Sequence, residues 1–87
     1  MENDKKPVEQ LKEREITASI WRNVSKYGTK YAVTFFRSYR SGEEWKRSSA
    51  FGRGELVSLA TLAAHAYERV SQLENNDRTR ETRHADL

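Results

Sequence analysis

Apolar and polar side chains alternate along two stretches of the chain, which is the pattern of half-buried β-strands. In residues 16–23 most even positions are apolar, and in residues 30–39 most odd positions are. A third strand is expected over residues 43–51, after a short loop that contains Gly42. The order of these segments predicts a three-stranded antiparallel meander.

Loop lengths assign the faces of this predicted sheet. A four-residue loop pairs Val24 with Thr29, and a three-residue loop pairs Tyr39 with Glu43. Since side chains alternate across a strand, these two pairings decide which residues face the core. The predicted core face comprises Ile16, Ala18, Ile20, Tyr31, Val33, Phe35, Tyr39, Trp45 and Phe51.

Residues 54–74 have the spacing of an amphipathic helix, with apolar residues three or four positions apart. Gly52 or Gly54 can cap its N-terminus, Glu55 lies favourably in the first turn, and a pair of asparagines after residue 74 can end it. The predicted apolar stripe comprises Leu56, Leu59, Ala63, Ala66, Val70 and Leu73, widened by Ala60 and Tyr67.

The predicted fold class is therefore α+β, with the order β-β-β-α. Residues 16–74 form the domain, and the charged segments 1–15 and 75–87 are expected to be a disordered N-terminal arm and a disordered C-terminal tail. We also expect a two-fold homodimer, because the sheet has open edges and the helical stripe is longer than three short strands can cover.

Composition excludes several classes of protein. The chain has 87 residues and no cysteine, so disulfides, thiolate metal sites and cysteine nucleophiles are absent. No apolar run is long enough to cross a bilayer, and we expect a cytoplasmic protein without a membrane partner. His65 and His84 lack the spacing of metal ligands, and Ser48 has no base nearby in sequence. We expect no catalytic residues, no metal and no cofactor, and hence no enzyme.

Positive charge is concentrated on the predicted sheet. Residues 16–54 contain eight basic and two acidic side chains, whereas residues 55–74 contain one basic and three acidic ones. On the sheet face opposite the core, aromatic side chains stand among cations and hydroxyls, which is typical of a surface that binds single-stranded nucleic acid. The candidate binding residues are Trp21, Phe36, Lys30, Arg40, Lys46 and Arg47. The alternatives are an ordinary solvated face with two amphipathic aromatic side chains, or a protein or dimer interface. The cations near the hairpin tip can form a phosphate clamp or can instead protect a sheet edge from aggregation.

Four short motifs carry a family resemblance: IWRN at 20–23, YxVxFxRSY at 31–39, GxEWK at 42–46 and FGR at 51–53. Together they resemble a small family of uncharacterised bacterial proteins, to which no function is assigned. The basic and aromatic strands before a glycine-rich helix entry are more loosely similar to the Pur-alpha repeats and the PC-type transcriptional coactivators. That likeness implies dimerisation and binding of single-stranded nucleic acid across the sheet. Those families have four strands, whereas the pattern here predicts three.

Two functional hypotheses follow. The first is a small non-enzymatic protein that binds single-stranded nucleic acid, DNA or RNA, through the basic and aromatic sheet face. The second is a protein–protein interaction module, an adaptor or an inhibitor of mobile-element origin, that does not bind nucleic acid. Binding that weakens with salt distinguishes the first from the second.

Overall fold

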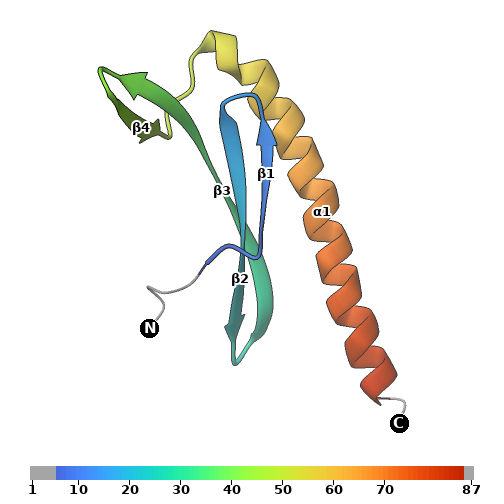
Figure 1. Cartoon of the computed structure of the whole chain (residues 1–87). Helices are drawn as coiled ribbons and strands as arrows, with labels where there is room; N and C mark the ends of the chain where they lie inside the picture. Colours follow the sequence, from blue (N-terminus) through green and yellow to red (C-terminus); the bar gives the residue numbers. More distant parts are fainter. Residues whose placement is uncertain (1–5, 86–87) are drawn as a thin grey trace.

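The computed structural model describes residues 6–85, and side chains up to residue 79. Its elements are β1 (Glu9–Glu13), β2 (Ile16–Ser25), β3 (Gly28–Ser41), β4 (Glu44–Ser48) and α1 (Arg53–Ala85). The strands form one antiparallel sheet in the order β1-β2-β3-β4, and helix α1 crosses one face of it (Figure 1). The predicted α+β class, with an antiparallel sheet before one C-terminal helix, is confirmed.

The predicted number of strands was wrong, because β1 lies within the segment 1–15 that was expected to be disordered. It pairs with β2 over its whole length, from Glu9 with Ile20 to Glu13 with Ile16. Helix α1 also continues to Ala85, well into the expected C-terminal tail. Of these two predicted tails, residues 1–5 and 86–87 lie outside the described part of the chain.

The register between β2 and β3 is the predicted one, with Val24 opposite Thr29 and Ile20 opposite Val33. The register between β3 and β4 is shifted by three residues, because Tyr39 pairs with Lys46, so the predicted pairing of Tyr39 with Glu43 was wrong. Ser41 pairs with Glu44, which leaves a two-residue turn that begins at Gly42, whose φ is 66°. Glycine at the first central position is the signature of a type II′ hairpin turn.

This shift turns β4 over relative to the prediction. Trp45 was predicted to face the core, but it pairs with Arg40 and is 68% exposed. Lys46 pairs with Tyr39 and therefore shares the helix side of the sheet. Because side chains alternate along a strand, a shift by an odd number of residues exchanges every residue of β4 between the faces. Tyr39, also predicted for the core, is 37% exposed.

The core lies where helix α1 crosses β2. Ile16 and Ala18 are fully buried against Leu62, and Leu11, Val33, Phe35, Phe51 and Leu59 pack around them. Leu62 was not in the predicted stripe, whereas Leu56 and Tyr67, which were, are 50% and 75% exposed. Helix α1 is thus rotated from the predicted orientation.

Two contacts fix the ends of this packing. At the start of helix α1, the Gly52 N–H donates to the Glu55 carboxylate at 2.6 Å, and the Glu55 N–H donates to the Gly52 carbonyl at 3.0 Å, a reciprocal cap. Along the helix, Arg69 Nε donates to both carboxylate oxygens of Glu9, at 2.8 and 2.9 Å, and so ties the edge strand β1 to α1. No helix in the described part of the chain is long and apolar enough to cross a membrane.

Candidate nucleic-acid interface

The side of the sheet turned away from helix α1, which we call the open face, follows from the observed register. It consists of the even positions of β1 and β3 and the odd positions of β2 and β4. Its charged and aromatic members are Lys12, Trp21, Lys30, Phe36, Arg40, Trp45 and Arg47. The small polar residues between them include Thr17 and Ser19, which are both buried.

The two sides of the sheet differ in charge. The open face has four cations and, among the strand residues of the structure, no carboxylate. On the helix side, three basic residues are balanced by three acidic ones, Glu9, Glu13 and Glu44. The sequence predicted an excess of positive charge on the sheet as a whole, and the observed register concentrates this excess on the open face.

Aromatic side chains recur at regular levels along the open face. Trp21 of β2 pairs with Ala32 of β3. Phe36 lies on β3 itself, four residues beyond that pair. Trp45 of β4 pairs with Arg40, which is four residues beyond Phe36. Four strand residues span about 13 Å, so the three rings mark a run of about 27 Å along β3. Lys30 stands at one end of this run and Arg40 at the other.

Each ring of the run is held by a neighbour. The Trp21 indole Nε1 donates to Thr34 Oγ1 at 2.9 Å, which leaves this half-buried ring lying against the sheet. The Arg47 guanidinium carbon lies 4.2 Å from the centre of the Phe36 ring, and that of Arg40 lies 5.4 Å from the Trp45 ring. A guanidinium over an aromatic ring forms a flat cationic surface, which can stack on a base and face a phosphate.

The structure therefore brings five of the six predicted binding residues onto one face and separates the sixth. Trp21, Phe36, Lys30, Arg40 and Arg47 share the open face, whereas Lys46 lies on the helix side.

Sequence reasoning missed Trp45, because the loop before β4 was taken to be one residue too long. The Gly-Glu pair at the turn was the available signal. It also missed Lys12, because β1 was not recognised as a strand.

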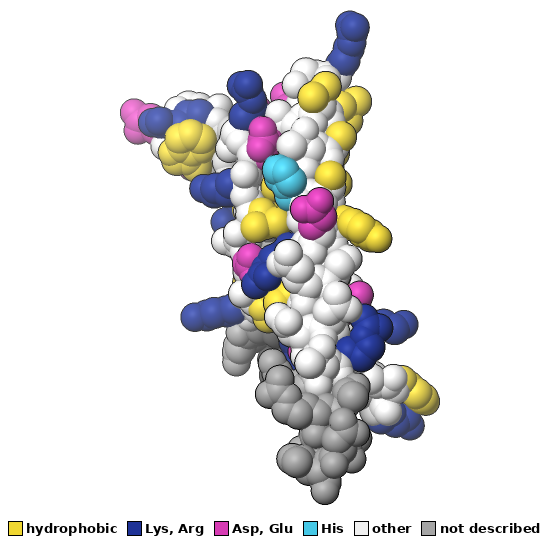
Figure 2. Space-filling model, turned by 90° about the vertical axis from the view of Figure 1, so that its right-hand side faces the viewer, with side chains coloured by type: hydrophobic (Ala, Val, Ile, Leu, Met, Phe, Trp, Pro, Cys, Tyr) yellow, Lys and Arg dark blue, Asp and Glu magenta, His cyan; other side chains and the backbone are white. Residues whose placement is uncertain are grey.

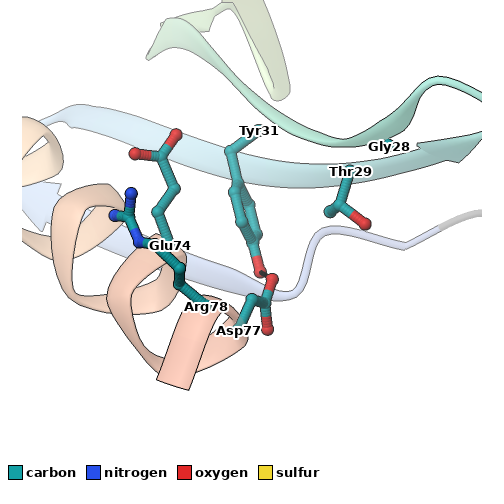
Figure 3. A pocket seen from close by; sticks show the side chains of 6 residues that line it. All are labelled: Gly28, Thr29, Tyr31, Glu74, Asp77 and Arg78. Atoms are coloured by element: carbon teal, nitrogen blue, oxygen red, sulfur yellow. Dashed lines mark hydrogen bonds between the residues drawn. The ribbon is translucent and has the colours of Figure 1, made fainter. Parts of the chain in front are cut away.

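A second polar site lies between the β2–β3 hairpin and the far half of helix α1. It is a depression of about 290 Å³, lined by Gly28, Thr29, Tyr31, Glu74, Asp77 and Arg78. Figure 3 shows the Tyr31 ring reaching from the sheet to the helix, where its hydroxyl donates to Asp77 Oδ2 at 2.7 Å. Arg22 Nε donates to the same hydroxyl at 3.2 Å and lies 3.6 Å from Asp77.

The contacts of Tyr31 explain its titration. Partial removal from water raises the pKa of Tyr31, and the hydrogen bond to Asp77 raises it further, although the bond from Arg22 acts in the opposite direction. The hydrogen bond to Tyr31, followed by the charge of Asp77, raises the pKa of Arg22. The hydrogen bonds from Arg22 to Tyr31 and from Tyr31 to Asp77 join the β2–β3 hairpin to helix α1 as a structural brace.

The described residues contain no group of three or more His, Cys, Asp or Glu side chains that could hold a metal ion. Comparisons with protein-family models, with curated proteins and with solved structures found no match to this chain. The likeness to the Pur-alpha and PC-type families therefore stays a prediction, and the site is interpreted from its own geometry.

Proposed function

We propose that this chain is a small binding protein that contacts single-stranded nucleic acid through the open face of its sheet. The observation that carries the proposal is that the open face, within the described strands, has four cations, three aromatic rings and no carboxylate. A flexible single strand binds to such surfaces by stacking its bases on rings and by placing its phosphates near cations. The four-stranded sheet also has the strand number of the two families that the sequence resembles.

The regular spacing of the rings favours an extended polymer over a compact ligand. Trp21, Phe36 and Trp45 follow β3 over about 27 Å, which is longer than a single nucleotide or a small metabolite. The open face is also a surface rather than a cavity, since its cations and Trp45 are exposed. In this arrangement, Lys30, Arg40 and Arg47 neutralise phosphates while the rings support bases.

The test compares two adjacent cations of β4 that lie on opposite sides of the sheet. Binding of a fluorescently labelled single-stranded oligonucleotide is measured by anisotropy over a series of salt concentrations. Arg47→Ala is expected to weaken binding and to lower the slope of log K against log salt by about 0.7, the value for one phosphate contact on a single strand. Lys46→Ala is the matched control and is expected to leave the slope unchanged.

Stacking gives a second readout that does not depend on charge. Trp45→Ala is expected to cost about 1–3 kcal/mol of binding free energy at an unchanged salt slope, because stacking releases no counterion. Equal effects of Arg47→Ala and Lys46→Ala would contradict the face assignment. A wild-type affinity weaker than about 0.1 mM at low salt would end the proposal and favour the protein-interaction module.

A further inference from the structure

The outward side of helix α1 has an apolar stripe that nothing in the described part of the chain covers. Val57 is 76% exposed and Tyr67 is 75% exposed, and the smaller Ala60 and Ala64 between them are exposed as well. Leu56, beside the stripe, is 50% exposed. Figure 2 shows hydrophobic side chains along one side of the upper half of this helix. Large apolar side chains gathered on one exposed helix face mark an interaction surface.

The spacing of this outward stripe is symmetric about one position. Val57 and Tyr67 are equally far in sequence from Leu62, and so are Ala60 and Ala64. Leu62 itself is fully buried on the sheet side of the helix. An antiparallel helix related by a two-fold axis at the level of Leu62 would therefore meet large side chains with large ones and alanines with alanines. Small residues at the centre allow two helix backbones to approach closely.

Charges at the two ends of the stripe are complementary under the same symmetry. Arg53 would lie at the level of Ser71 in the second helix, about 4.5 Å along the axis from both Glu68 and Glu74. Arg53 and Glu68 are exposed, and no ion pair within the described chain involves either of them. A second copy of this chain would thus place a cation beside two carboxylates at each end of the contact.

The small core gives a physical reason for such a partner. Only five apolar side chains are buried within the described chain: Ile16, Ala18, Ile20, Leu62 and Ala66. A helix pair in contact from Arg53 to Ser71 extends about 27 Å, enough to add substantially to this core.

We propose that a second copy of this chain docks antiparallel on the outward stripe of helix α1. The two open sheet faces then point away from each other, so this interface is independent of the proposed nucleic-acid surface.

The experiment measures the association state by sedimentation equilibrium. The wild-type chain is expected to be a dimer at micromolar concentration. Ala64→Arg introduces a charge at the centre of the contact and is expected to raise the dimer dissociation constant at least about 100-fold. His65→Arg adds the same side chain at the next, exposed position, which points away from the outward stripe, and it should leave the constant within about threefold. Circular dichroism verifies that both variants are folded.

A charge reversal tests the antiparallel geometry separately. Arg53→Glu is expected to weaken the dimer about tenfold, and adding Glu68→Arg to the same chain should restore part of the loss. A wild-type chain that is monomeric up to high micromolar concentration would overturn the proposal. Equal dissociation by Ala64→Arg and His65→Arg, or no rescue by the double variant, would do so as well. Oligonucleotide binding is scored independently, so either proposal can fail without the other.

Discussion

Replacing Leu62 by alanine tests the observed orientation of helix α1 most directly. Leu62 has no exposed surface and packs against Ile16 and Ala18 on β2. A buried leucine changed to alanine typically costs about 2–5 kcal/mol, from lost transfer free energy and from the cavity left behind. Leu62 lies at the centre of the apolar cluster between helix α1 and β2, so we expect a cost in the middle of this range, about 3–4 kcal/mol. A chain of this length has a total stability of about 4–13 kcal/mol, so the loss is a large share.

Leu56→Ala is the matched control, because it removes the same atoms about one and two-thirds turns away on the same helix. Leu56 is already 50% exposed, so its loss should cost about 1 kcal/mol or less within one copy. Urea unfolding, followed by circular dichroism at submicromolar protein, measures both variants with self-association suppressed. A cost for Leu56→Ala equal to that of Leu62→Ala would refute the orientation and favour the stripe predicted from the sequence.

Two further predictions concern the contacts that join helix α1 to the sheet. Tyr31 has a raised pKa when folded, so its contribution to stability is complete below pH 10 and is lost as the pH rises through the folded pKa. Titration of tyrosinate absorbance should show one tyrosine ionising late, and Tyr31→Phe should remove that step; its persistence would contradict the brace. Glu9→Gln should cost up to about 1 kcal/mol at low salt and less at high salt, because the partly exposed pair with Arg69 is screened. An equal loss of unfolding free energy in Glu9→Gln at low and at high salt concentration would argue against the ion pair.

The parts of the fold that the sequence predicted are those in which local pattern and tertiary packing agree. The alternation in β2 and β3 predicted their register, because Ile16, Ala18 and Ile20 have one apolar face to bury and the turn before Gly28 is short. Strand β1 could not be found in this way. It contains three charged residues and a single apolar one, Leu11, and it is a strand because β2 offers its edge and Arg69 binds Glu9. Tertiary context of this kind overrides strand propensity.

The helix presents a different limit. Its first half has apolar residues on all sides, so periodicity alone could not say whether Leu62 or the neighbouring Ala63 faces the sheet. The structure resolves this by burying Leu62 and leaving Val57 and Tyr67 exposed. An ambiguous pattern in the sequence is therefore informative in itself. A helix with more apolar surface than its own sheet covers is expected when a second partner covers the rest.

The candidate site depended on a single turn. Charge and aromatic content predicted the right strands, and five of the six candidate residues share the open face. The length of the turn before β4 determined whether Lys46 or Trp45 lies on that face, and the turn is one residue shorter than predicted. The correction strengthens the physical argument for binding. It moves an indole onto the face that already holds Trp21 and Phe36, and it sends Lys46 to the side where carboxylates balance the cations. Because these two residues are adjacent and on opposite faces, substitution of Trp45 must weaken the binding of any ligand of the open face, whereas substitution of Lys46 must leave its affinity unchanged. If binding depended only on the overall charge and aromatic content of the chain, both substitutions would weaken it.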